Sequence, residues 1–171
     1  MNIISKILRI NNFFRFTICG LPFTIINIMD WQKNILETDA EIRSLFAETK
    51  RIAVIGIKME SFQPAFYVPQ YMQSAGYEII PVPVYYPDAT EILGEKVYRN
   101  LTAVPGEIDL VNVFRRSNDV AKHVEDILAK KPKAVWMQSG IRNDEAAETL
   151  AKQGIKVVQD LCLMVEHRAL R

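Results

Sequence analysis

Five short apolar runs along the chain alternate with segments whose apolar residues recur every three or four positions. A nearly continuous apolar run is typical of a strand buried on both faces, whereas the three-to-four spacing is typical of an amphipathic helix. The runs predict strands at residues 51–57, 77–82, 108–114, 133–138 and 155–159. The periodic segments predict helices at residues 39–49, 65–75, 118–130 and 144–153, a helix or coil at 162–170, and a loop or short helix at 30–36.

Polar residues that can cap helices stand at the start of several of these segments. Thr38 and Glu41 have the spacing of a capping box, in which each side chain accepts a hydrogen bond from the other residue's backbone N–H. Asn143 is expected to cap the helix that follows it, and Ser117 or Asn118 is expected to cap the helix that ends near residue 130. These caps support the predicted boundaries.

The alternation of strands and helices predicts the fold class. We expect a single α/β domain with a doubly wound, mainly parallel, five-stranded, Rossmann-like sheet. Residues 84–101 interrupt the alternation, with a turn expected at 87–88 and a short extended piece near 95–98. Ligands of such sheets bind at the carboxyl ends of the strands, where the strand order reverses.

The first strand and the loop after it are the strongest local indication of a ligand. Residues 51–57 are apolar apart from Arg51 and Gly56, and the polar loop 58–64 leads into a helix. A glycine at this point allows a sharp turn and a close approach of a ligand to the main chain. The free N–H groups and the dipole of a helix N-terminus favour a phosphate there.

Charge divides the chain into two parts. Residues 1–29 contain three basic residues and no acid, which leaves 18 basic and 20 acidic residues in 30–171. This mildly acidic body argues against a nucleic-acid binder. The stretch 1–29 has three possible explanations: a targeting segment, a membrane anchor, or a gene-model extension upstream of an initiator at Met29, which we favour. We expect the folded domain to span residues 30–171.

Several common site types are absent from the sequence. A dinucleotide fingerprint needs three glycines after the first strand and an acid at the end of the second. This chain has only Gly56 after the first strand and ends the second with Val82 and Pro83. It has no P-loop, and His123 and His167 belong to no recognisable nucleophilic triad or zinc motif. The two cysteines form no disulfide framework and suit a reducing compartment.

Cations follow three of the predicted strands at the carboxyl edge. Lys58 follows the first strand, Arg115 and Arg116 follow the third, and Arg142 follows the fourth. Together they suit a polyanionic nucleotide, although each could instead be a solvated loop charge. Metal-binding and catalytic residues are not indicated.

The ordered segments from Arg51 to the C-terminus resemble the small, single-domain CoA-binding proteins. Their domain is similar to the N-terminal domain of the succinyl-CoA synthetase alpha subunit. The resemblance is carried by residues 53–57, 64–68, 76–83, 92–98, 109–115, 135–138, 140–146 and 157–162, with Tyr71 and Glu166.

The resemblance implies that CoA or an acyl-CoA binds at the carboxyl edge. The residues expected to contact it are Gly56, Ile57, Lys58, Pro64, Val68, Val82, Pro83, Val113, Phe114, Arg115, Gln138 and Gly140. Backbone N–H groups at residues 56–58 would line the nucleotide, Val82 and Pro83 would flank adenine, and Lys58 or Arg115 would pair with a phosphate. Glu60 departs from the family pattern and would oppose a phosphate unless it points away.

The expected function is therefore CoA binding without demonstrated catalysis. The alternatives are an NAD(P)-dependent oxidoreductase and a subunit of an acyl-CoA-transforming enzyme. We expect no nucleic-acid partner and no membrane association of the folded domain, and a homodimer or a protein partner stays open. The expected location is the cytoplasm, or an organelle if residues 1–29 are a targeting segment. Cys162 is either a buried structural cysteine or a thiol able to form a mixed disulfide with CoA.

Overall fold

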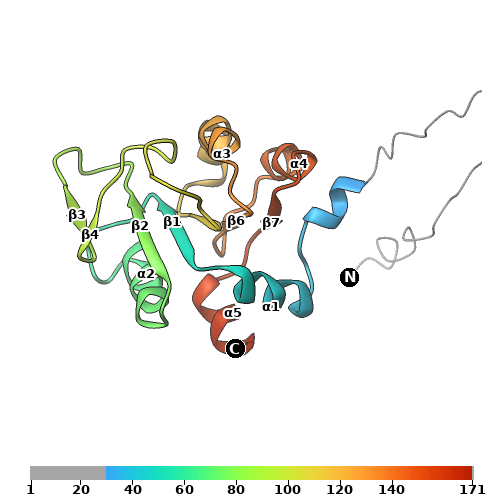
Figure 1. Ribbon diagram of the computed structural model, residues 1–171, viewed down its shortest axis with the longest axis horizontal. Helices are drawn as coiled ribbons and strands as arrows, with labels where there is room; N and C mark the ends of the chain where they lie inside the picture. Colours follow the sequence, from blue (N-terminus) through green and yellow to red (C-terminus); the bar gives the residue numbers. More distant parts are fainter. Residues whose placement is uncertain (1–29, 171) are drawn as a thin grey trace, which may run out of the picture.

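The computed structural model describes residues 30–170, and the alternatives given for residues 1–29 lie outside them. A five-stranded sheet forms the centre of the domain (Figure 1), with the order β2-β1-β5-β6-β7 and every neighbouring pair parallel. The predicted α/β class and parallel sheet are thus confirmed. The strands are β1 (Arg51–Ile55), β2 (Glu78–Val82), β5 (Leu110–Val113), β6 (Ala134–Met137) and β7 (Lys156–Val158).

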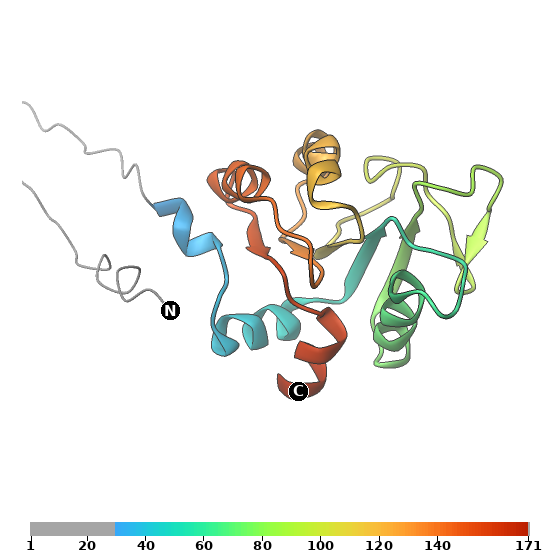
Figure 2. The same cartoon turned by 180° about the vertical axis from the view of Figure 1, so that it is seen from behind.

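Helices cover both faces of this sheet. The helices α1, α2 and α5 lie on one face, and α3 and α4 lie on the other (Figures 1 and 2). The α-helices are α1 (Asp39–Glu48), α2 (Pro64–Ser74), α3 (Val124–Lys130), α4 (Asp144–Lys152) and α5 (Leu163–Leu170), and the 3-10 helices are η2 (Asp30–Asn34) and η3 (Ser117–His123).

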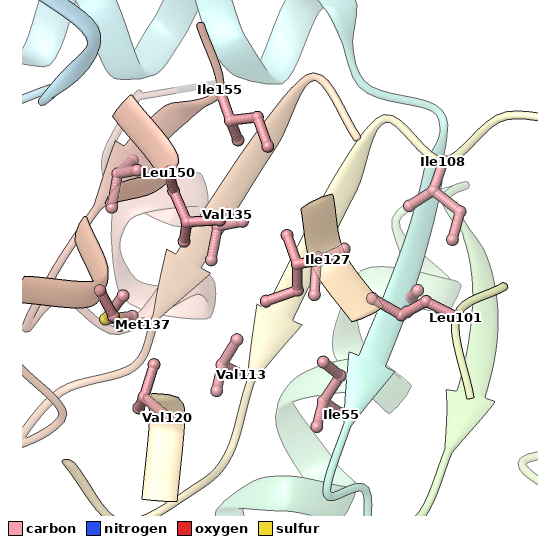
Figure 3. Packing of buried hydrophobic residues seen from close by; sticks show 14 of the residues in the cluster. Ile55, Leu101, Ile108, Val113, Val120, Ile127, Val135, Met137, Leu150 and Ile155 are labelled. Carbon is pink, nitrogen blue, oxygen red and sulfur yellow. The ribbon is translucent and has the colours of Figure 1, made fainter. Parts of the chain in front are cut away.

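Alternation along each strand builds two separate cores. Ile55, Val113 and Val135 point to the face covered by α3 and α4 and pack there with Ile127 (Figure 3). Their neighbours in sequence, including Trp136, point to the face covered by α1, α2 and α5. Because successive side chains of a strand alternate between faces, a strand that is apolar throughout can fill both cores.

The interruption between β2 and β5 forms a small antiparallel hairpin. It consists of β3 (Glu91–Ile92) and β4 (Glu95–Lys96) at the outer edge of the domain. The extended piece expected near residues 95–98 corresponds to β4. The hairpin continues the chain from the loop after β2, which flanks the site described below.

Two of the three predicted helix caps are present. Glu41 N–H donates to Thr38 Oγ1 at 3.4 Å and Thr38 N–H donates to Glu41 Oε2 at 3.0 Å, while Ala146 N–H donates to Asn143 Oδ1 at 2.9 Å. The third prediction was wrong. Ser117 is already inside η3, and its hydroxyl oxygen instead accepts a hydrogen bond from the backbone N–H of Arg142 at 3.2 Å.

The Asp109 carboxylate connects the amino ends of three strands through hydrogen bonds and an ion pair. Its Oδ2 accepts hydrogen bonds from the N–H groups of Lys50 and Arg51, both at 2.9 Å, and its Oδ1 pairs with Lys133 Nζ at 2.6 Å. Burial opposes ionisation, but these three donors outweigh it and hold the pKa of Asp109 below its ordinary value. The carboxylate therefore joins the chain before β1, β5 and β6.

Gly56 allows β1 and β5 to meet at their carboxyl ends. Its φ is +81°, and a Cβ at this position would lie 2.4 Å from the carbonyl oxygen of Phe114. Gly56 N–H donates to the Val82 carbonyl at 2.9 Å, and Phe114 N–H donates to the Ile55 carbonyl at 2.9 Å. The chain leaves β1 toward α2 on one face and leaves β5 toward η3 and α3 on the other, so a crevice opens beside Gly56.

We predict that Asp109→Asn lowers the free energy of unfolding by about 1–3 kcal/mol at neutral pH, because one amide oxygen cannot replace both carboxylate oxygens. The lowered pKa means that this contribution is present above about pH 4 and is lost as the pH falls through the folded-state pKa. Urea unfolding of both proteins from pH 3 to 7 measures it. Lys133→Met, which removes only an exposed cation, should lose less than about 1 kcal/mol. A difference between Asp109→Asn and wild type that did not vary with pH would contradict this role.

We predict that Gly56→Ala destabilises the domain more than Gly154→Ala. Gly154 has nearly the same φ, +82°, but a Cβ there meets nothing within 4 Å. Both variants carry left-handed backbone strain of about 1–2 kcal/mol, and the collision with the Phe114 carbonyl should add roughly 1–3 kcal/mol to the first. Urea unfolding of the two variants measures the difference. Equal losses would show that β1 and β5 do not approach as closely as described.

Candidate functional site

A cleft of about 470 Å³ opens at the carboxyl ends of β1, β5 and β6. This size and position are those of a small-molecule site in a doubly wound sheet. The loop after β1, the first turn of α2, the loops after β5 and β6, and the residue before α5 all contribute to it. Its walls are formed by Gly56, Lys58, Gln63, Pro64, Ala65, Tyr67, Val68, Phe114, Arg115, Arg116, Gln138, Ser139, Ile141 and Cys162.

The cleft carries positive charge without acidic residues in its lining. Lys58, Arg115 and Arg116 are its three charged members. Arg115 lies 3.6 Å from Asp119, whereas Lys58 and Arg116 form no salt bridge with any residue of the range 30–170. Arg115 Nε is buried and lacks a hydrogen-bond partner among the described atoms. A set of cations with so little internal neutralisation suits a ligand that has several negative charges.

The N-terminus of α2 opens directly onto the cleft. Gln63 occupies the cap position but makes no side-chain capping hydrogen bond, and Pro64 begins the helix. Gln63, Pro64 and Ala65 all line the cleft. Pro64 has no N–H, and the N–H groups of Gln63 and Phe66 donate to the carbonyls of Glu60 and Gln63. The N–H of Ala65 and the partial positive charge of the helix end therefore remain to attract an anion.

Glu60 is turned toward a tyrosine. The hydroxyl of Tyr86 donates to its carboxylate, at 2.6 Å from Oε2 and 2.8 Å from Oε1. This hydrogen bond is the main reason that the pKa of Glu60 lies below its ordinary value. Glu60 does not line the cleft. The departure from the family pattern noted in the sequence therefore adds no acidic side chain to the cleft walls.

The floor of the cleft is a fixed amide network. Gln138 is buried, donates through Nε2 to Asn112 Oδ1 at 2.8 Å, and accepts through Oε1 from the N–H of Leu163 at 3.3 Å. The second contact caps the first turn of α5. Next to Leu163, Cys162 is a free, half-buried thiol in the wall of the cleft. A rigid floor of this kind holds the shape of the cleft before a ligand enters.

The structure brings together more than half of the residues expected from the sequence. Those that line the cleft are Gly56, Lys58, Pro64, Val68, Phe114, Arg115 and Gln138. Those that do not line it are Ile57, Val82, Pro83, Val113 and Gly140.

The five residues outside the lining have identifiable other environments. Ile57 is fully buried in the core under α1, α2 and α5, and Val82 and Val113 are buried in the core under α3 and α4. Pro83 is buried, and the N–H of Gly140 donates to Asp160 Oδ1 at 2.6 Å. The backbone donors at 56 and 58 are also engaged, with Val82 and Ala65 carbonyls respectively. Two of the three backbone donors that were expected to line the nucleotide are therefore already engaged.

Sequence reasoning had not selected the other seven lining residues. Gln63, Ala65 and Tyr67 could have been found from the helical spacing around Pro64 and Val68, because residues three and four apart share a face. Ser139 and Ile141 flank the expected Gly140. Arg116 had been placed at the carboxyl edge and Cys162 had been named as a thiol that could form a mixed disulfide with CoA, but neither had been selected as a ligand contact.

Other kinds of site receive no support. Glu78 lies at the amino end of β2 and pairs with Arg51 at 2.9 Å, so it is remote from the strand end where a dinucleotide's ribose would be held. Within residues 30–170, no group of three or more His, Cys, Asp or Glu residues could hold a metal ion. None of the helices described has the length and apolar character needed to span a bilayer.

Comparisons with known proteins agree with this geometry. The model of the CoA binding domain family matches residues 50–168. The uncharacterised protein YneT of Bacillus subtilis is 41% identical over 128 residues, which cover 75% of this chain and 93% of YneT.

Two solved structures have the same fold and clear sequence similarity. The Thermus thermophilus protein "cell-free ID.343" is 38% identical with a TM-score of 0.74, and the match covers 79% of this chain and all of that one. A hypothetical protein from Pyrococcus horikoshii OT3 is 31% identical with a TM-score of 0.73, covering 78% of this chain and 92% of its own. The family match spans all five strands of the sheet, and on this basis the chain belongs to the CoA binding domain family.

Proposed function

We propose that the chain binds CoA or an acyl-CoA in the cleft between the loops after β1 and β5. The observation that carries the proposal is the set of three cations, without an acidic lining residue, beside the uncapped N-terminus of α2. CoA contains a diphosphate and a 3′-phosphate, so its recognition needs several positive groups close together. Membership of the CoA binding domain family supports the same ligand.

Each lining group has a distinct part in this proposal. Lys58, Arg115 and Arg116 pair with the phosphates, and the first turn of α2 contributes its partial positive charge. Phe114 and Val68 supply apolar walls for the adenosine or pantetheine portion. No residue of the cleft is assigned to bond making or breaking, and the function proposed is binding.

Calorimetry with CoA, dephospho-CoA and NAD tests this function. We expect the folded protein to bind CoA and to ignore NAD, because β2 ends without an acid for the ribose. A preference for CoA over dephospho-CoA would place a cation on the 3′-phosphate. Lys58→Ala and Arg115→Ala should each weaken CoA binding about ten-fold or more, since a hydrogen bond to a charged group contributes about 1.5–3 kcal/mol.

Lys152→Ala is the matched control. Lys152 is an exposed lysine of α4 that pairs with Glu148 at 2.6 Å and does not line the cleft. Its loss changes the net charge by the same amount and should leave CoA affinity within about two-fold, because screened surface charges act weakly over distance. Indifference of a folded sample to all three nucleotides would refute the proposed function, as would an equal effect of Lys152→Ala and Lys58→Ala.

A further inference from the structure

Two cations of the cleft share one aromatic side chain. Lys58 Nζ lies 4.0 Å from the centre of the Tyr85 ring, and Arg115 Cζ lies 5.7 Å from it. Lys58 comes from the loop after β1, Arg115 from the loop after β5, and Tyr85 from the loop between β2 and β3. A cation within about 6 Å of a ring centre is attracted by the negative face of the ring. Tyr85 therefore stabilises two like charges in neighbouring positions.

An aromatic ring differs from a carboxylate in what it leaves for a ligand. A carboxylate that held Lys58 and Arg115 together would also neutralise them. The neutral ring of Tyr85 attracts both cations without neutralising them, so the contact of Arg115 with Asp119 is the one ion pair among residues 30–170 that competes with an incoming anion for these two cations. The same cations also act on the phenol. A hydrogen bond with Arg115 and the positive charges of Arg115, Lys58 and Arg116 hold the pKa of Tyr85 below its ordinary value.

Hydrogen bonds with two other segments hold the loop that carries Tyr85. Next to it, Tyr86 has a left-handed backbone, with φ +63°, and its hydroxyl donates to Glu60 in the loop after β1. The carbonyl of Tyr86 accepts a hydrogen bond from Arg99 Nη1 at 3.1 Å. A left-handed conformation in a bulky residue is uncommon and persists where the surroundings enforce it. The position of Tyr85 is thus built by contacts from two other segments, although the residue itself is half exposed.

We infer that Tyr85 is a positioning residue for anion binding, which holds Lys58 and Arg115 side by side so that both face the phosphates of CoA. This inference rests on the proposed function for the identity of the ligand. That the ligand is an anion follows from the cations themselves and does not depend on the proposed function. A ring in this place could alternatively stack on the adenine base, and the experiment below separates the two roles.

The test compares Tyr85→Leu, Tyr85→Phe and the neighbouring control Val84→Ala, using CoA and inorganic pyrophosphate as separate probes. Val84 is also exposed and has no aromatic ring that could attract a cation. We expect Tyr85→Leu to weaken both probes by about 3- to 10-fold, the effect of losing a cation–π contact of about 0.7–1.4 kcal/mol. Tyr85→Phe keeps the ring but loses the hydrogen bond between the phenol and Arg115, so its affinity for both probes should lie between those of Tyr85→Leu and wild type. Val84→Ala should bind both probes within about two-fold of wild type.

Two further readouts separate positioning from a merely structural role. The affinity of Tyr85→Leu should depend less steeply on NaCl concentration than that of wild type, because fewer charges are then held at the ligand. In the Lys58→Ala background, Tyr85→Leu should have a smaller effect than it has alone, since one of its two partners is already absent. Thermal unfolding of each variant confirms that the fold is retained.

Three results would overturn the positioning role of Tyr85, and a fourth would separate it from the proposed function. Loss of CoA affinity with unchanged pyrophosphate affinity would assign the ring to adenine stacking and overturn it. Unchanged affinity for both probes would also overturn it, and so would a failure of wild type to bind either probe. If wild type ignored CoA but bound pyrophosphate in a Tyr85-dependent way, the proposed function would fail and the positioning role would stand.

Discussion

The site is built around the close approach of β1 and β5 at their carboxyl ends. Only glycine fits at position 56, because a Cβ there would lie 2.4 Å from the Phe114 carbonyl oxygen. Directly after this contact the chain leaves β1 and β5 toward opposite faces of the sheet. Lys58 lies two residues after Gly56, and Arg115 lies one residue after Phe114. The approach that opens the crevice therefore also brings two cations to its rim.

Positive charge is concentrated here with little opposing negative charge nearby. Two acids close to these cations in the sequence oppose them only weakly. Glu60 accepts from Tyr86, and Asp119 lies 3.6 Å from Arg115 but pairs more closely with Lys122, at 2.6 Å. The aromatic face of Tyr85 takes the place that a carboxylate could have filled. The cleft is therefore prepared for a ligand that brings its own negative charge, and the family to which the chain belongs identifies CoA as the leading candidate.

Local sequence patterns were sufficient for the sheet and for part of the site. The apolar runs predicted all five strands, and Thr38 and Asn143 predicted two caps, because these features depend on neighbours within a few residues. The start of η3 was missed because Ser117 bonds to Arg142, which is 25 residues away. The contacts of Tyr85 were not predicted for the same reason, because its partners come from the loops after β1 and β5. Beside it, the left-handed Tyr86 is held by Glu60 and Arg99, which are also distant in the sequence. Contacts of this range depend on strand order, which periodicity does not reveal.

CoA or an acyl-CoA is the ligand proposed for the cleft beside Gly56. Native mass spectrometry of the protein purified without added nucleotide tests this proposal most directly, because a ligand bound in the cell is then weighed together with the chain. We expect a non-covalent adduct with the mass of CoA or an acyl-CoA, which is released on denaturation and is less abundant in Arg115→Ala. An adduct with the mass of a nicotinamide nucleotide, which an excess of CoA did not displace, would contradict the proposal.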